Sequence, residues 1–313
     1  MKSFKPLAIA SALVAAMSIN VQAAELNKIG ISLGSMGNPF FVALANGAEA
    51  KAKEINPNVE VLAMGYDYDL GKQFNQIDNF IAAGVDLILL NPGDPHAIAP
   101  AIKRAQKAGI TVVSVDTAAE GSDATVTTDN VSAGAVACEY IVKALNGKGN
   151  VIIQNGPQVS AVIDRVQGCK AEFAKAPGIK VLSDDQDGKG SRDGGMAVML
   201  GHLTRYNNID AVFTTNDPQA IGTNLAAKQL KRDGIIITAV DGAPDIVAAL
   251  KDPSSPMIQG SGSQDPYKMA QVAVEIGNKL LNGETVEQTT VLLPSQLVTR
   301  DNVDSYQGWD AVR

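Results

Sequence analysis

Two polar segments follow apolar runs in a matching way, and their side chains could bind one small molecule. Asp116 and Asp241 each end an apolar run that begins after a Gly-Ile pair. In each half of the chain an earlier apolar run also ends in asparagine and aspartate next to proline, at 91–95 and at 216–218. Carboxylates accept hydrogen bonds, while amides both donate and accept them. These residue types at matching places favour a binding site rather than a catalytic one.

The matching segments belong to a longer internal repeat. The stretch 85–98 is echoed by 209–221, and each copy continues through a helical pattern to a second apolar run. The spacing from Asp94 to Asp116 is nearly the same as the spacing from Asp217 to Asp241. Ligands of open α/β sheets bind at the carboxyl ends of the strands. The repeat therefore predicts two similar lobes that face each other across a cleft.

Short apolar runs alternate with helical patterns along the whole chain, which is typical of successive βαβ units. The expected strands are 28–33, 59–64, 86–90, 111–115, 150–154, 179–183, 211–214, 235–240, 257–259 and 290–293. The expected helices are 40–55, 71–83, 97–108, 133–145, 161–175, 218–230 and 266–281.

The predicted fold class is α/β, with two similar doubly wound parallel-sheet lobes joined by a multi-strand hinge. No low-complexity linker divides the chain, so the first change of lobe is placed at the polar stretch 127–130. We expect the first lobe to comprise 24–128 and 265–291, and the second lobe 129–264 and 292–313. A hinge of several segments permits closure while it keeps the lobes aligned.

The segment 1–23 has the pattern of a signal peptide. Lys2 and Lys5 precede an apolar stretch at 6–19, and 21–23 ends in small residues suited to cleavage. Export to the periplasm is therefore expected. The formal net charge is −7, and loss of these two lysines makes it −9, which disfavours nucleic acid as a partner.

Few residues could serve as metal ligands or as catalytic groups. Cys138 and Cys169 are the only cysteines, and in an exported protein they could form a disulfide or remain two buried thiols. His96 and His202 stand apart from each other and from metal-ligand spacings. We expect no metal, no cofactor and no enzymatic activity.

Several motifs in a fixed order carry a family resemblance. Asn38-Pro39-Phe40-Phe41 opens the first helix, Val115-Asp116 ends the fourth strand, and 160–168 opens a second-lobe helix with Asp164-Arg165. Thr215-Asn216-Asp217, Val240-Asp241-Gly242 and Gln264 complete the series. Over the whole mature chain this resembles the periplasmic sugar-binding proteins of ABC importers, the ribose-binding type in particular.

The resemblance implies a set of ligand-binding residues from both lobes. Sugars offer hydroxyl groups to carboxylates, amides and guanidinium groups, and apolar C–H faces to aromatic rings. The implied ligand-binding residues are Asn38, Phe40, Phe41, Asp116, Thr117, Arg165, Asn216, Asp241 and Gln264.

Structural roles are the alternative for most of these residues. Asn38 could only start a helix, and Phe40 and Phe41 could only anchor the core. The two aspartates could only cap turns, and Arg165 could lie on a helix surface. Tyr66–Asp69 could line the cleft or form a plain polar turn, and Trp309 is expected to dock the C-terminal tail.

Two departures from the ribose-binding pattern affect the expected ligand. The pattern has arginine after the fourth-strand aspartate, where this chain has Thr117. It also has an aromatic residue where the chain has Gly190. With one guanidinium and one ring fewer, we expect a smaller or acyclic polyol, or an unusual monosaccharide, in place of ribose.

The resemblance implies capture of a small sugar or sugar alcohol by closure of the lobes, and delivery to an inner-membrane ABC permease. The protein is expected to be monomeric, and an interaction with a chemoreceptor stays open. A quorum-signal or nucleoside receptor of the same fold is the first alternative, and an exported α/β hydrolase is the second. A sugar-responsive repressor would need an N-terminal DNA-binding helix pair and a basic surface, which the sequence does not have.

Overall fold

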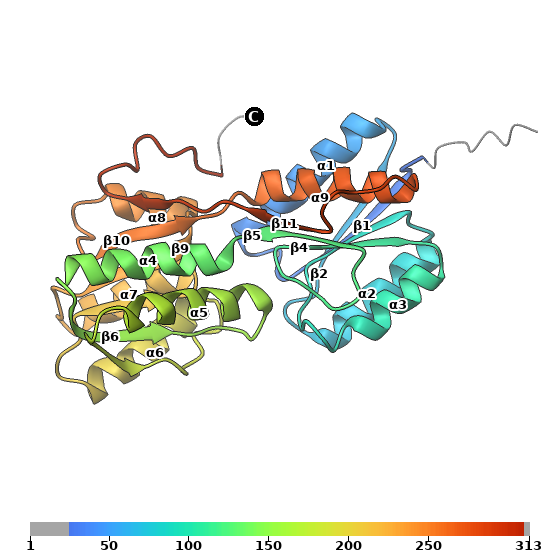
Figure 1. Ribbon diagram of the computed structural model, residues 1–313. Helices are drawn as coiled ribbons and strands as arrows, with labels where there is room; N and C mark the ends of the chain where they lie inside the picture. The colour runs from blue at the N-terminus through green and yellow to red at the C-terminus, as the bar shows by residue number, and fades with distance from the viewer. Residues whose placement is uncertain (1–24, 310–313) are drawn as a thin grey trace, which may run out of the picture.

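The computed structural model describes residues 25–309 and shows two lobes side by side (Figure 1). The expected signal peptide, 1–23, lies outside the described residues. Each lobe has a sheet of six strands, in the order β2-β1-β3-β4-β5-β11 in the first lobe and β7-β6-β8-β9-β10-β12 in the second. Strand pairs are parallel except β10 with β12. The matching strand orders confirm the two similar lobes that the sequence repeat predicts.

The elements of the first lobe come from both ends of the described chain. They are β1 Lys28–Leu33, α1 Pro39–Ile55, β2 Glu60–Gly65, α2 Leu70–Ala83, β3 Leu87–Leu90, α3 Ala99–Lys107, β4 Thr111–Val115, β5 Ala124–Thr128, α9 Pro266–Leu281 and β11 Thr290–Leu293.

The second lobe is formed by the middle of the chain and one late strand. Its elements are α4 Asn130–Ala144, β6 Lys148–Gln154, α5 Ser160–Ala174, β7 Gly178–Ser183, α6 Arg192–Arg205, β8 Ala211–Thr214, α7 Asp217–Gln229, β9 Ile236–Asp241, α8 Pro244–Lys251, β10 Ile258–Ser263 and β12 Leu297–Thr299.

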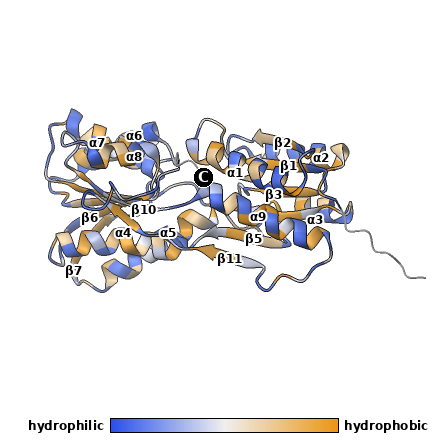
Figure 2. Ribbon diagram, turned by 90° about the horizontal axis from the view of Figure 1, so that it is seen from above, coloured by the Kyte–Doolittle hydropathy of each residue, from blue (hydrophilic) through white to orange (hydrophobic). Residues whose placement is uncertain are grey.

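Each sheet is covered by helices on both faces, so its central strands are apolar throughout. Strands β3 and β8 are buried at every position, as expected for a parallel sheet between two helical layers. In the first lobe α1 and α9 pack together on one face, and α2 and α3 on the other. In Figure 2 the hydrophobic colour gathers on strands that lie between helices.

The chain crosses between the sheets three times. The crossings lie between Thr128 and Asn130, between Ser263 and Pro266, and between Leu293 and Leu297. The last crossing lies slightly beyond the division expected at 291 and 292, because β11 pairs with β5 through Leu293. Among residues 25–309, no helix is long and apolar enough to span a membrane.

Two helices of the second lobe, α4 and α5, approach each other closely enough for their backbones to touch. A Cβ atom added at Gly134 would lie 2.0 Å from the carbonyl oxygen of Arg165, and one added at Gly168 would lie 2.0 Å from that of Val131. Glycine is therefore required at both positions. The same pair of helices carries the disulfide between Cys138 and Cys169, so of the two states left open for these cysteines the structure has the disulfide.

The disulfide closes a loop with a sequence separation of 31 residues, and its removal should destabilise the second lobe. We expect the double variant Cys138→Ser/Cys169→Ser to lose about 3 kcal/mol of unfolding free energy, chiefly because the unfolded chain gains freedom. Thermal unfolding followed by circular dichroism measures this change. Reduced wild-type protein should show a similar loss, and the double variant should not respond to reductant. Equal melting temperatures of oxidised and reduced wild type would contradict the prediction.

Candidate ligand-binding site between the lobes

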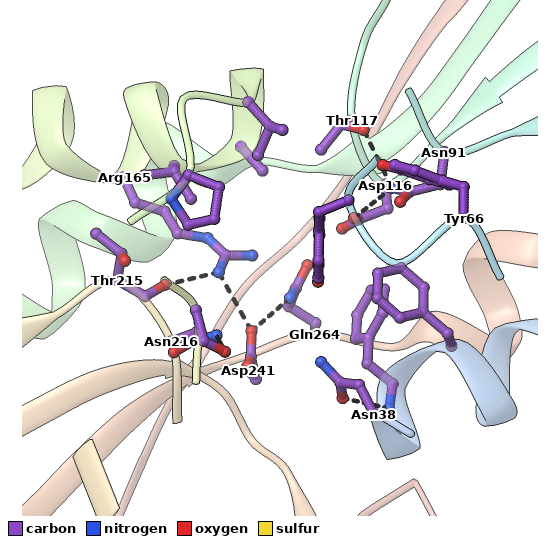
Figure 3. Close-up of a pocket in the computed structure, with 18 residues that line it drawn as sticks. Asn38, Tyr66, Asn91, Asp116, Thr117, Arg165, Thr215, Asn216, Asp241 and Gln264 are labelled. Atoms are coloured by element: carbon purple, nitrogen blue, oxygen red, sulfur yellow. Dashed lines mark hydrogen bonds and ion pairs between the residues drawn. The ribbon is translucent and has the colours of Figure 1, made fainter. Parts of the chain in front are cut away.

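The carboxyl ends of both sheets border one cleft with an empty volume of about 600 Å³, partly open to solvent. Side chains and backbone from both lobes face one another across it (Figure 3). All the residues expected to bind ligand line this cleft: Asn38, Phe40, Phe41, Asp116, Thr117, Arg165, Asn216, Asp241 and Gln264. The structure thus brings the expected set together, and the ligand-binding role of each residue stays a prediction.

Asp116 lies directly after β4 with a backbone that few residues adopt. Its φ is 68°, in the left-handed region, where a non-glycine residue stores strain that often marks a functional site. Asn91, which follows β3, donates from Nδ2 to Oδ2 of Asp116 at 2.9 Å. Burial raises the pKa of Asp116 to about 7, against the opposing effect of Arg165. Near neutral pH this carboxyl group is therefore poised between its two protonation states.

Thr117 does not take the place of a charged donor. Its hydroxyl donates to the carbonyl oxygen of Pro92 at 3.1 Å and accepts a hydrogen bond from Asn91 at 3.1 Å. The side chain is buried, with 3% of its surface exposed. Thr117 therefore supports the Asn91–Asp116 pair more directly than it offers a group to a ligand.

Asp241, at the end of β9, is the second-lobe counterpart of Asp116. Its Oδ1 accepts hydrogen bonds from Nε2 of Gln264 at 2.8 Å and from Nη1 of Arg165 at 3.2 Å. Its φ of 149° is again in the positive range. Burial raises the pKa of Asp241, and the adjacent guanidinium opposes that rise. Both lobes thus present a buried strand-end carboxylate, as the repeat predicts.

Arg165 lies on α5, whose close contact with α4 brings the side chain inward. Nε donates to Oδ1 of Asn130 at 2.8 Å, and Nη1 also donates to the carbonyl oxygen of Thr215 at 2.8 Å. Nη2 makes no hydrogen bond with the described residues and remains available in the cleft. With 4% of its surface exposed, Arg165 is not the surface residue considered as an alternative.

Two asparagines combine a structural role with a place in the cleft. Oδ1 of Asn38 accepts from the backbone N–H of Phe40 at the start of α1, and Oδ1 of Asn216 accepts from that of Gln219 at the start of α7. Asn38 thus starts a helix, and its ligand-binding role stays a prediction. Its Nδ2 makes no hydrogen bond with residues 25–309, whereas Nδ2 of Asn216 donates to the carbonyl oxygen of Gly190 at 2.9 Å.

The aromatic residues of the first lobe form an apolar wall of the cleft. Phe40 and Phe41 are each 4% exposed and belong to the first-lobe core, yet both line the cleft. Tyr66 and Tyr68 line it too, so the segment 66–69 is a turn whose two tyrosines line the cleft. Gly190 lies on the opposite side with a φ of 60°, where any other side chain would be strained. No other second-lobe residue of the cleft lining supplies the aromatic ring that the ribose-binding pattern has at this position.

Gln264 lies at the second crossing and connects the lobes through its side chain. Its Oε1 accepts from the hydroxyl of Thr128 at 2.8 Å, while its Nε2 donates to Asp241. Its carbonyl oxygen accepts from Nε1 of Trp309 at 3.0 Å, and the indole packs edge-to-face on Phe40 with ring centroids 5.5 Å apart. Trp309 docks the tail as expected.

Two buried hydroxyl groups at the cleft have no hydrogen-bond partner within the described chain. They belong to Tyr66, which is fully buried, and to Thr215, which is 1% exposed. Buried polar atoms are nearly always paired with protein, water or ligand. Tyr66, Asn91 and Thr215 were not among the expected ligand-binding residues, although each directly follows a strand.

Comparison with known proteins places this architecture in a family. The sequence profile of a family described as periplasmic binding protein domain matches residues 29–285. The chain belongs to this family. A ribose import binding protein of Bacillus subtilis is 31% identical over 281 residues, with 87% of each chain covered. A xylitol-binding protein of Mycolicibacterium smegmatis is 30% identical, over 90% of this chain and 79% of the relative.

Solved structures of periplasmic binding proteins share the fold. An ABC transporter solute-binding protein of Bacillus halodurans with bound myo-inositol superposes with a TM-score of 0.81 at 26% identity. The match covers 90% of this chain and 97% of the other. The two parallel-sheet lobes predicted from the sequence are thus those of the type I periplasmic binding proteins. Members of this family bind substrates rather than convert them.

Proposed function

We propose that this periplasmic binding protein captures a small hydroxyl-rich molecule, a monosaccharide or sugar alcohol, and delivers it to an inner-membrane ABC permease. One observation carries the proposal. Two buried strand-end carboxylates, one from each lobe, lie at a single cleft with Arg165 and two unpaired hydroxyl groups. Hydroxyl groups of a guest can donate to the carboxylates and accept from Arg165, which explains why such polar groups are tolerated at a buried place.

The bound molecule would itself hold the lobes together. Asp116, Tyr66 and Asn38 reach the cleft from the first lobe, and Arg165 and Thr215 reach it from the second. A guest that bonds to both sides has a higher affinity for the closed arrangement and shifts the population toward it. Because closure alone can report occupancy to a permease, no chemical change of the guest is needed. Export of the mature protein after cleavage near residue 23 belongs to the same proposal.

Calorimetric titration tests the proposal. Protein freed of retained ligand by unfolding and refolding is titrated with D-ribose, D-allose, xylitol and myo-inositol. We expect at least one of them to bind with a dissociation constant in the micromolar range or below, about 8 kcal/mol or more of binding free energy. The recovered guest should be chemically unchanged. Absence of binding throughout, together with no retained molecule in native mass spectra of untreated protein, would overturn the proposal.

A further inference from the structure

We propose that the preferred guest is a polyol that carries one protonated amine, with the ammonium group held beside Asp116 among the aromatic rings of the first lobe. The inference rests on the proposed function and specifies its substrate class. Four observations carry it: the charge balance of the cleft, the partners of Asp116, the aromatic wall, and the separation of this wall from the hydrogen-bonding groups of the second lobe.

The side chains that line the cleft include more acidic groups than basic ones. Asp116 and Asp241 are acidic, and Arg165 is the one basic residue in the lining. Arg165 forms its ion pair with Asp241, at 3.2 Å. Asp217, a third carboxyl group with 1% exposure, lies behind Asp241, and burial raises its pKa well above the ordinary value, which favours its neutral form. When Asp116 is ionised, its negative charge is therefore left without a cation from the lining.

Asp116 is the carboxylate that lacks an ion-pair partner. Its side-chain hydrogen bond comes from the neutral amide of Asn91. Position 117, where the ribose-binding pattern has arginine, holds a threonine whose hydroxyl is already bonded within the protein. A buried carboxylate without a cation is costly to ionise. A guest that brings its own ammonium group would supply the missing charge and a charge-assisted hydrogen bond.

The rings around Asp116 favour a cation as well. Phe40, Phe41, Tyr66 and Tyr68 all line the cleft from the first lobe, with the two tyrosine rings edge-to-face at 6.0 Å. The negative faces of aromatic rings attract ammonium groups, most strongly where water is excluded. Tyr68 is 47% exposed, so its ring borders solvent at the mouth of the cleft, and partial desolvation together with Asp116 and Asp241 raises the pKa of its hydroxyl.

The backbone holds Tyr68 at this place under strain. Asp67 and Tyr68 have consecutive positive φ values of 54° and 58°, which non-glycine residues seldom adopt. The turn is fixed by the bond from the backbone N–H of Asp69 to the carbonyl oxygen of Tyr66, and Asp69 then caps α2. A strained turn that ends at a cleft is expected where the side chain has a binding role.

The other side of the cleft remains suited to hydroxyl groups. Nη2 of Arg165 makes no hydrogen bond within residues 25–309 and can donate there to a hydroxyl group of the guest. The aromatic rings of the cleft lining thus all come from the first lobe, whereas its guanidinium group comes from the second. A polyol with an amine at one end matches this division better than a uniformly hydroxylated guest.

Paired ligands test the inference by calorimetry in phosphate buffer at pH 7.5. The pairs are sorbitol with its 1-amino-1-deoxy analogue, D-glucose with D-glucosamine, and myo-inositol with an inositol in which one hydroxyl is replaced by an amine. We expect the amine to bind at least tenfold more tightly than its neutral partner in at least one pair. Equal or tighter binding of the neutral member in every pair that binds would overturn the inference and leave the proposed function standing. Failure of both members in all pairs, and of the four sugars above, would overturn both.

Two variants locate the preference at Asp116. Asp116→Asn should remove the tenfold advantage of the amine, because the carboxylate is gone while the amide still accepts from Asn91. Thr117→Arg, which supplies a cation next to Asp116, should shift the preference toward the neutral member. Thr204→Arg, on the exposed side of α6, is the matched control and should leave the preference unchanged. An amine advantage that survives in Asp116→Asn would show that the ammonium group binds elsewhere and would overturn the assignment.

Discussion

Replacing Arg165 by methionine is expected to weaken ligand binding at least a hundredfold and to destabilise the ligand-free protein. The guanidinium holds Asn130, the carbonyl oxygen of Thr215 and Asp241 together at the cleft. Methionine fills a similar volume but leaves these groups without their donor. Loss of one partner from a buried ion pair costs about 3–5 kcal/mol, because the remaining charge stays buried.

Two measurements separate the effects of Arg165→Met. Titration calorimetry with the tightest ligand gives the loss of affinity, and thermal unfolding gives the loss of stability. Arg104→Met is the matched control, because Arg104 pairs with Asp78 on the surface with about half of each side chain exposed. That variant should change the unfolding free energy by less than about 0.5 kcal/mol and leave affinity unchanged. Affinity of Arg165→Met within threefold of wild type would contradict the prediction.

Replacing Asp116 by asparagine should have opposite effects on binding and on stability. Binding of the preferred ligand should fall at least tenfold, because a neutral amide replaces the carboxylate at the cleft. The ligand-free protein should become more stable at pH 8, by up to about 4 kcal/mol or several degrees in melting temperature. Asparagine also tolerates the positive φ of 68° at this position better than most residues.

The pH dependence follows from the raised pKa of Asp116, which is about 7 in the folded protein against an ordinary value of 3.8. The unfolded chain releases this proton at lower pH than the folded protein does. The group therefore favours folding fully below pH 4, and this contribution is lost as pH rises through 7. The stability difference between Asp116→Asn and wild type should grow from pH 4 to pH 8. Thermal unfolding at several pH values measures this difference. A difference that shrinks over this range would show that folding does not raise the pKa of Asp116.

The central strands of both sheets could be predicted from the sequence because burial on two faces leaves apolar runs such as β3 and β8. The elements that were not predicted lack this signal. Strand β5 is rich in threonine, and α6 has glycines and little separation of apolar from polar faces. Strand β10 extends past the expected 257–259 through a Gly-Ser-Gly-Ser segment. These elements form because the rest of the fold places them against a sheet.

The site was predictable to the extent that it depends on strand ends. Asp116 and Asp241 stand out because the repeat places them alike. Asn91 was visible in the repeat, but nothing in the sequence indicates that its side chain turns toward Asp116. The disulfide could not be assigned because the contact between α4 and α5 depends on tertiary packing.

Strand β11, at 290–293, borders β5, at 124–128, although the whole second lobe except β12 lies between them in the sequence. During synthesis, β5 therefore lacks its partner strand β11, and the sheet edge stays unpaired until nearly all of the protein has left the ribosome. The unpaired backbone N–H and C=O groups of an open sheet edge can form hydrogen bonds with strands of other chains. A nascent or truncated chain that ends before residue 290 should therefore require chaperone protection, and premature termination should yield aggregates rather than an independently folded first lobe.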